Sequence, residues 1–184
     1  MIQSQALLQR ERGVAGTALP DVLRHSGAPR GSIYHHFPDG RAQLAAEATE
    51  WAANWVADDL ERSLAEGDIE NALDRFIDKW TAILRDYDFA AGCPVTAGAL
   101  DAGKDSGARA AAAEGFKRWE GLVKEALIRN GLPEDRAESL AVTFISATEG
   151  AIVLARAEAS LRPIERVAAE LRALFSNELR RTEG

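Results

Sequence analysis

Side chains suited to bonding nucleic acid are concentrated in one ten-residue stretch, residues 28–37. Its sequence is Ala-Pro-Arg-Gly-Ser-Ile-Tyr-His-His-Phe, polar at the start and aromatic at the end. Arg30 can bond guanine O6 and N7 in bidentate fashion, which is worth roughly 1–3 kcal/mol of discrimination between bases. Small or hydrogen-bonding residues that suit contact with bases or phosphates follow it: Gly31, Ser32, Tyr34 and His35. The alternatives are a solvated arginine and a tyrosine whose ring only packs.

Two short helices are predicted to position these side chains. The first covers residues 17–26, because its apolar residues fall on one face at helical spacing. Thr17 can cap it, and Gly27 suits the left-handed turn that follows it. The second runs over residues 29–36. Two such helices joined by a tight turn predict a helix-turn-helix, whose second helix can enter a DNA major groove.

Helical periodicity extends over most of the remaining chain. Further helices are predicted at 2–12, 40–65, 69–85, 108–129, 134–160 and from 163 onward. The stretch 86–107 is irregular, with several glycines and a short helix predicted at 95–102. Because no stretch alternates apolar and polar residues with the period of a strand, the sequence predicts an all-α fold.

The distribution of charge is uneven along the 184 residues. The net charge of −7 argues against a uniformly basic nucleic-acid binder. Residues 1–45 hold five basic and three acidic side chains, which gives a net charge of +2. The remaining 139 residues hold 17 basic and 26 acidic side chains, which gives a net charge of −9. A weakly positive end on an acidic body is compatible with nucleic-acid contact through one face.

The composition also predicts a cytoplasmic protein without a membrane segment. The single cysteine excludes an internal disulfide and is typical of a reducing compartment. No apolar run approaches the roughly 20 residues that a membrane helix needs. The N-terminus lacks the basic region and apolar core of a secretory signal.

A pattern of glycines, small polar residues and aromatic residues marks the N-terminal part: Gly13, Thr17, Leu19, Val22, Gly27, Gly31, Ser32, Tyr34, His36, Phe37 and Leu44. In this pattern the chain resembles the DNA-binding domain of the TetR family of bacterial repressors. Later groups, at 91–95, 116–120, 149–151 and 155–157, are similar to the branch of lincomycin-resistance and flavonoid-responsive repressors. The resemblance implies a three-helix helix-turn-helix DNA-binding domain at 1–45. A helical bundle for ligand binding and dimerisation would follow at 46–184.

The resemblance also implies a homodimeric repressor that binds a palindromic operator in double-stranded DNA and is released by a small molecule. A palindrome needs two recognition helices roughly 34–36 Å apart, which a two-fold dimer supplies. The last two long helices are unusually apolar, and in TetR-like proteins the corresponding pair packs against its copy. The alternative is that their apolar residues are all intramolecular core. The branch implies flavonoids or antibiotics as ligands.

Family matches assign phosphate contacts to several residues. The Tyr34 hydroxyl matches the family tyrosine that bonds phosphate, and Thr17 and Arg41 are assigned the same kind of contact. Gly40 stands where many members carry a phosphate-binding lysine, so Arg41 is a shifted match. Pro29 replaces the usual capping serine. The first helix is predicted almost at the start of the sequence, without the basic arm that usually precedes it in the family.

Aromatic side chains around the irregular stretch predict an apolar ligand site in the second domain. The residues predicted to line it are Trp55, Phe76, Trp80, Phe89, Cys93, Trp119, Phe144 and Glu149. The alternative is that most of these rings only fill the core. Glu149, inside an apolar helix, could orient a ligand, pair with Arg156 or lie at a dimer seam. Cys93 is better explained as a partly buried structural thiol than as a nucleophile or redox sensor.

No catalytic, metal or cofactor site is predicted. His35 and His36 are adjacent and point about 100° apart on a helix, unlike the i, i+4 pair of a helical zinc site. The sequence shows no nucleophile–base set and no phosphate-binding glycine loop, so an enzyme is not expected. The remaining alternative to a repressor is a helical ligand-binding dimer with weak or lost DNA binding. The acidic body and Pro29 motivate it.

Overall fold

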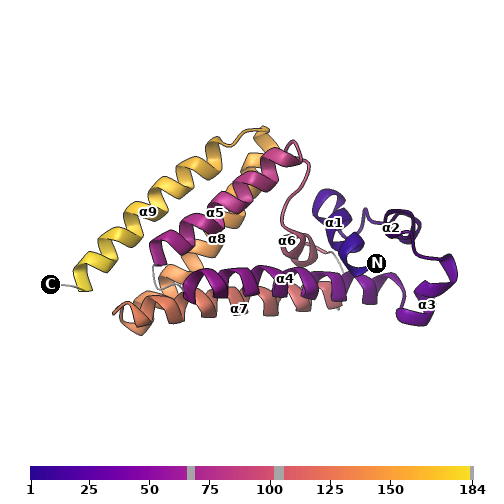
Figure 1. Ribbon diagram of the computed structural model, residues 1–184, viewed down its shortest axis with the longest axis horizontal. Coiled ribbons are helices and arrows are strands. Elements are labelled where there is room, and N and C mark those ends of the chain that lie inside the picture. Colours follow the sequence, from indigo (N-terminus) through magenta and orange to yellow (C-terminus); the bar gives the residue numbers. More distant parts are fainter. Residues whose placement is uncertain (66–68, 102–105, 183–184) are drawn as a thin grey trace. The chain divides into compact units, whose positions relative to one another are not determined.

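The computed structural model (Figure 1) describes residues 1–65, 69–101 and 106–182, which form helices and no strand. The helices are α1 (Ile2–Arg12), α2 (Leu19–Ser26), α3 (Ile33–His36), α4 (Arg41–Ala65), α5 (Ile69–Asp86), α6 (Pro94–Ala99), α7 (Gly107–Arg129), α8 (Glu134–Glu158) and α9 (Arg162–Thr182). One turn of 3-10 helix, η1 (Arg30–Ser32), directly precedes α3. The predicted all-α fold is confirmed. The short helix predicted at 95–102 is α6 and ends at Ala99, while position 102 lies outside the described residues.

The described residues pack as two compact units. Residues 1–55 and 91–116 form the N-terminal unit, and residues 56–90 and those from 117 onward form the C-terminal unit. This division by packing differs from the domain boundary predicted after residue 45. It differs because α6 and the first part of α7 pack with the N-terminal helices, a long-range contact that no local sequence pattern indicates.

A small apolar core fixes the short helices of the N-terminal unit. Its buried side chains come from α1 to α4 and from the residue after α3: Leu8, Val22, Ile33, Phe37 and Leu44. Burying a side chain of this size contributes roughly 1.5–3 kcal/mol relative to leaving it exposed. A helix of four residues is not stable alone, so α3 depends on the burial of Ile33 and Phe37.

A buried polar network joins α1, α4 and the start of α6. The amide of Gln9, a fully buried residue, donates to Thr49 Oγ1 at 3.0 Å and to the Pro94 carbonyl at 2.9 Å. Gln5, also fully buried, donates from its amide to Gln9 Oε1 at 3.1 Å. Buried amides need such partners, because an unsatisfied one carries the full cost of desolvation. The inward face of α1 is therefore partly polar, which helical periodicity of apolar residues does not predict.

Two glycines let helices of the N-terminal unit approach more closely than any side chain would allow. A Cβ atom built on Gly98 of α6 would lie 2.7 Å from Thr49 Cγ2. A Cβ atom built on Gly115 of α7 would lie 2.6 Å from Ala53 Cβ on α4. Neither neighbour is the end of a flexible side chain, so the helix backbones would have to separate to admit a methyl group.

We expect Gly115→Ala to lower the free energy of unfolding by about 1–3 kcal/mol, because overpacking outweighs the helix propensity of alanine. For a chain of this size the melting temperature should fall by roughly 2–12 °C, measured by circular dichroism. The matched control is Gly121→Ala on the same helix, where a Cβ atom meets nothing within 4 Å and the change should be neutral or stabilising. An unchanged melting temperature for Gly115→Ala would refute the close approach of α4 and α7.

Helices α5, α8 and α9 of the C-terminal unit lie against one another (Figure 1), and aromatic rings pack between them. Phe144 of α8 is fully buried and lies between rings of the other two helices. Its ring centroid is 5.4 Å from that of Phe76 on α5 and 6.0 Å from that of Phe175 on α9. Tilted and edge-to-face pairs at these distances are favourable beyond the area they bury. Phe144 therefore occupies the centre of this unit.

Ion pairs on the surface of the C-terminal unit join α8 to α9 and α7 to α8. Arg136 of α8 donates to Glu178 of α9 at 2.7 Å, and this hydrogen bond lowers the pKa of the Glu178 carboxyl. Lys124 of α7 donates to Glu134 and Glu138 of α8, and these bonds raise the pKa of the Lys124 ammonium group. Exposed pairs of this kind add little stability, so they fix orientation more than they hold the unit together.

The helix α8 carries an exposed apolar face. Val142 is 41% exposed, and Val153 and Leu154 are each 52% exposed, whereas Phe144 and Ile152 on the opposite face are buried. By length and composition alone α8 could cross a membrane, but the core helix of a soluble protein passes the same test, and 44% of the apolar window is buried inside the fold. Exposed apolar side chains on one side of a helix are typical of an interaction surface.

Candidate functional site

The segment from α2 to α3 has the geometry of a helix-turn-helix. Gly27 ends α2 in the left-handed conformation, with φ 70° and ψ 10°, which glycine adopts without steric cost. The Ser32 N–H then donates to the Pro29 carbonyl at 3.0 Å, which closes the 3-10 turn η1. The helix predicted over 29–36 is therefore present as a 3-10 turn followed by one turn of α-helix. Gly31, which has a low propensity for α-helix, lies in the 3-10 turn.

Most side chains predicted to contact nucleic acid lie on the exposed surface of η1 and α3. Arg30, Gly31 and His35 are exposed, and Tyr34 is 69% exposed, so the Tyr34 ring is not part of the core. Ser32 is half-buried, and its hydroxyl donates to the Pro29 carbonyl at 2.6 Å. The structure thus exposes an arginine, a phenol and an imidazole within six residues of the chain, on a segment fixed by the buried core.

The other two predicted contacts are placed differently. Thr17 is fully buried, and its hydroxyl donates to the Gly13 carbonyl at 2.8 Å. The predicted cap at Thr17 is wrong, because Ala18 is the N-cap of α2 and the threonine hydroxyl closes the preceding turn instead. Arg41 is exposed at the start of α4, where one guanidinium nitrogen donates to the Ala15 carbonyl at 3.3 Å. A guanidinium carries five N–H donors, so this one bond leaves donors with which Arg41 could bond an anion.

The residues predicted to line a ligand site are divided between the two units. Trp55 and Cys93 belong to the N-terminal unit, where Trp55 is 46% exposed and Cys93 is buried. The other six belong to the C-terminal unit. Of these, Phe89 and Glu149 are half-buried, and the buried members form part of the core: Phe76, Trp80, Trp119 and Phe144. These four rings therefore fill the core, as the alternative to a ligand site proposed.

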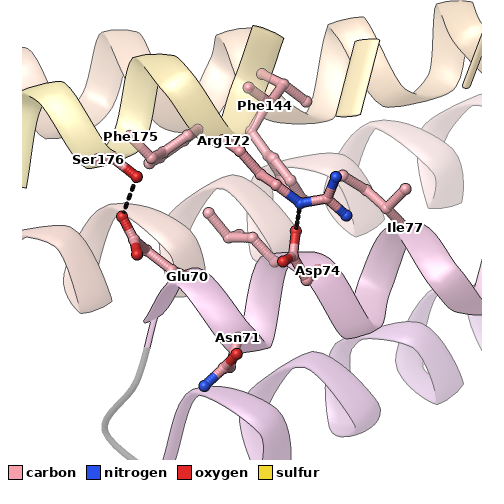
Figure 2. A pocket seen from close by; sticks show the side chains of 10 residues that line it. Glu70, Asn71, Asp74, Ile77, Phe144, Arg172, Phe175 and Ser176 are labelled. Carbon is pink, nitrogen blue, oxygen red and sulfur yellow. Dashed lines mark hydrogen bonds and ion pairs between the residues drawn. The ribbon is translucent and has the colours of Figure 1, made fainter. Parts of the chain in front are cut away.

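A pocket opens between α5, α8 and α9 of the C-terminal unit, with a volume of about 130 Å³ (Figure 2). Its floor is apolar and is formed by Leu73, Ile77, Phe144, Leu171 and Phe175. Its rim is polar and is formed by Glu70, Asn71, Asp74, Arg172 and Ser176. Arg172 Nε donates to Asp74 Oδ1 at 2.6 Å, and Ser176 Oγ donates to Glu70 Oε1 at 2.5 Å. Phe144 is the member of this pocket that the sequence predicted as a ligand residue.

The polar rim was not predicted from the sequence. A weak signal was present, because Glu70 and Asp74 are four residues apart on α5, and Arg172 and Ser176 are four residues apart on α9. Each pair therefore lies on one face of its helix. The two faces meet across 98 residues of sequence between Asp74 and Arg172, a pairing that no local pattern reveals.

The connection between α5 and α6 is bonded near both of its ends. In the C-terminal unit, Arg156 of α8 donates to the Ala90 carbonyl at 2.8 Å. In the N-terminal unit, the Gly92 N–H donates to the Arg10 carbonyl at 2.9 Å, next to the bond from Gln9 to Pro94 described above. Ala91 alone separates Ala90 from Gly92 in the chain.

The comparisons with known proteins concern both parts of the chain. Residues 7–48 match the family described as bacterial regulatory proteins, tetR family. Residues 70–170 match the family described as transcriptional regulator LmrA/YxaF-like, C-terminal domain. An HTH-type transcriptional regulator of Mycobacterium tuberculosis is 47% identical over 187 residues, covering 97% of this chain and 94% of that protein. The HTH-type transcriptional regulator LmrA of Bacillus subtilis is 30% identical over 83% of this chain and 82% of its own length.

Solved structures show the same fold. A TetR transcriptional regulator from Legionella pneumophila superposes with a TM-score of 0.83 at 21% identity, over 94% of each chain. A regulatory protein TetR from Rhodobacter sphaeroides gives a TM-score of 0.80 at 22% identity, over 94% of this chain and 96% of that one. At these identities the likeness concerns the fold alone, whereas the family matches and the 47% relative bear on function.

Proposed function

The chain belongs to the TetR family of bacterial transcriptional regulators, and from this membership we propose that it is a homodimeric repressor. In this proposal the dimer binds a palindromic operator and is released when a small apolar or aromatic molecule binds the helical bundle. The observation that carries the proposal is the exposed row of Arg30, Tyr34 and His35, held in place by the buried side chains of Ile33 and Phe37.

Each exposed side chain has a distinct role in this proposal. Arg30 contacts a base edge, most favourably guanine, because its planar guanidinium matches O6 and N7. The Tyr34 hydroxyl and the Arg41 guanidinium bond phosphates, which positions the module without reading sequence. His35 contacts a base or a phosphate, and Gly31 lets the backbone approach the duplex. Thr17 is left out of this interface because it is buried in the structure.

The proposed dimer uses the exposed apolar face of α8. Val142, Val153 and Leu154 would be buried against the same face of a second copy, as the last two long helices pack in other members of the family. A two-fold interface is self-complementary, so one apolar face serves both subunits. The arrangement accounts for side chains that would otherwise remain exposed to water.

Release requires that the effector bind one conformation of the dimer more tightly than the other, because only differential affinity shifts the equilibrium. We propose that the signal passes along the connection between α5 and α6. That segment is bonded to Arg156 of α8 in the C-terminal unit and to Arg10 of α1 in the N-terminal unit. A change in α8 on ligand binding would then alter the position of α1, which contributes to the core that fixes α3.

The proposed base contact predicts that Arg30→Ala weakens operator binding by roughly 5–150-fold per half-site and relaxes the preference at one base position. Tyr34→Phe should instead weaken binding to all sequences alike, because it removes a phosphate contact. Fluorescence anisotropy with the operator and with single-base variants of it distinguishes the two patterns.

Arg166→Ala is the matched control for this experiment, because it removes the same charge from an exposed position of α9. Its operator affinity should equal that of the parent. If Arg30→Ala kept both the affinity and the base preference of the parent, the assignment of Arg30 to a base would be wrong.

A further inference from the structure

An open hollow on the N-terminal unit brings an arginine of α2 close to the predicted nucleic-acid contacts. The hollow lies between α2 and the segment formed by η1 and α3, and its lining includes Arg24, Arg30 and Tyr34. Arg24 belongs to the last turn of α2, and its side chain is 74% exposed. The surface that carries Arg30 and Tyr34 therefore holds a second guanidinium group.

Arg24 belongs to a cluster of three charged side chains that together carry one net positive charge. Its Nη1 donates to Asp21 Oδ1 at 2.8 Å, and Nη1 of Arg12 on α1 lies 3.7 Å from Asp21 Oδ2. Two arginines thus share one carboxylate. A guanidinium carries five N–H donors, so the bond to Asp21 orients Arg24 and leaves donors for a second anion.

Exposed positive charge is scarce in the N-terminal part of the chain. Residues 1–45 contain five arginines and no lysine. Arg10 is half-buried, and four arginines are exposed: Arg12, Arg24, Arg30 and Arg41. Of these four, Arg24 and Arg30 line the hollow. Because neutralisation of phosphates supplies a large share of the affinity of a protein for DNA, an exposed arginine beside Arg30 is expected to contribute to binding.

We propose that Arg24 bonds a phosphate of the DNA backbone beside the base that Arg30 contacts. This inference rests on the proposed repressor function and adds to it a contact from α2. In a helix-turn-helix the first helix crosses the backbone while the second enters the major groove, so an exposed cation at the end of α2 meets a phosphate. The bond is charge-assisted and adds affinity without reading sequence. The Asp21 carboxylate does not cancel the positive charge, because Arg12 balances it.

Arg24→Gln tests the contact by fluorescence anisotropy across a salt series, with an operator selected from random double-stranded DNA. Log K falls with log salt by about 0.9 for each phosphate contacted, so a dimer that loses one contact in each half-site should show a slope shallower by about 1.8. Since the two lines converge near 1 M salt, the affinity at 0.1 M should be about eightfold lower per half-site. The loss should be equal for single-base variants of the operator. Arg24→Lys keeps the charge and should keep the slope of the parent.

Arg62→Gln is the matched control, because it removes the same charge from the same kind of ion pair. Arg62 is 69% exposed and lies 3.3 Å from Asp59, three residues earlier on α4, but it is not part of the hollow. Its salt slope should equal that of the parent. Both glutamine variants should melt within about 2 °C of the parent, because exposed ion pairs contribute little stability.

The possible results separate this inference from the proposed function. A parent that binds its operator, together with an unchanged slope for Arg24→Gln or an equal loss of slope for Arg62→Gln, overturns the role of Arg24 alone. A loss confined to one base position also overturns it, because Arg24 would then contact a base. A parent without salt-dependent binding to any duplex overturns the repressor proposal, and the phosphate contact with it.

Discussion

Replacing Val153 and Leu154 together by aspartate is expected to convert the proposed dimer into a folded monomer that does not bind a palindromic operator tightly. The two side chains are adjacent on α8 and each is 52% exposed, so the monomer tolerates polar groups there. In the proposed two-fold interface the same change buries four carboxylates without partners. Burying each unpaired carboxylate costs several kcal/mol, and this cost destabilises the interface.

Sedimentation velocity measures this outcome directly, and circular dichroism shows whether the monomer is folded. The control is Ile128→Asp on α7, which introduces one aspartate at an apolar residue that is 40% exposed. That variant should remain dimeric. A Val153→Asp, Leu154→Asp variant that is folded and still dimeric would exclude this face of α8 from the interface.

Gln9→Leu is expected to cause the second large effect, a loss of about 3 kcal/mol in the free energy of unfolding. Leucine cannot accept from the buried Gln5 amide or donate to the half-buried Pro94 carbonyl, and each lost bond costs about 1–3 kcal/mol. The hydroxyl of Thr49 keeps its own bond to the Ala45 carbonyl and adds little to the cost. The melting temperature should fall by roughly 6–12 °C.

The same substitution tests the proposed route of the signal. Hydrogen exchange at the Gly92 amide, which donates to the Arg10 carbonyl, should accelerate, because the neighbouring bond from α1 to Pro94 is lost. Gln3→Leu is the matched control, since Gln3 is an exposed glutamine on the same helix. That control should shift the melting temperature by no more than about 2 °C. If Gln9→Leu were as stable as Gln3→Leu, the network would not be holding α6 to α1.

The sequence predicted most helices well because their ends carry strong local signals. Gly27 ends α2 in the left-handed conformation, as expected, and α1, α5, α7 and α8 begin or end within a residue or two of their predicted limits. The exposed row on η1 and α3 was also visible, since apolar Ile33 and Phe37 flank polar residues. Helix ends and the alternation of apolar and polar residues depend on neighbouring residues, so one sequence is enough to predict them.

Features that depend on contacts distant in sequence were not predicted. Gln9 looks like a surface residue in the sequence, yet it is buried because its partners, Thr49 and Pro94, lie 40 and 85 residues away. The packing boundary after residue 55 and the polar rim of the pocket also depend on contacts between residues that are distant in sequence. Thr17 illustrates a smaller failure, because a threonine hydroxyl can cap the following helix or close the preceding turn, and the local sequence fits both.

Selection from a random pool of double-stranded DNA, followed by binding of the selected sequence across a salt series, tests the central claim most directly. The repressor account predicts a palindromic sequence with two half-sites. It also predicts a log K that falls steeply with log salt, by about 0.9 for each phosphate contacted. No enriched sequence, together with weak binding and a shallow salt dependence, would contradict it. That result would favour a helical ligand-binding dimer without operator binding.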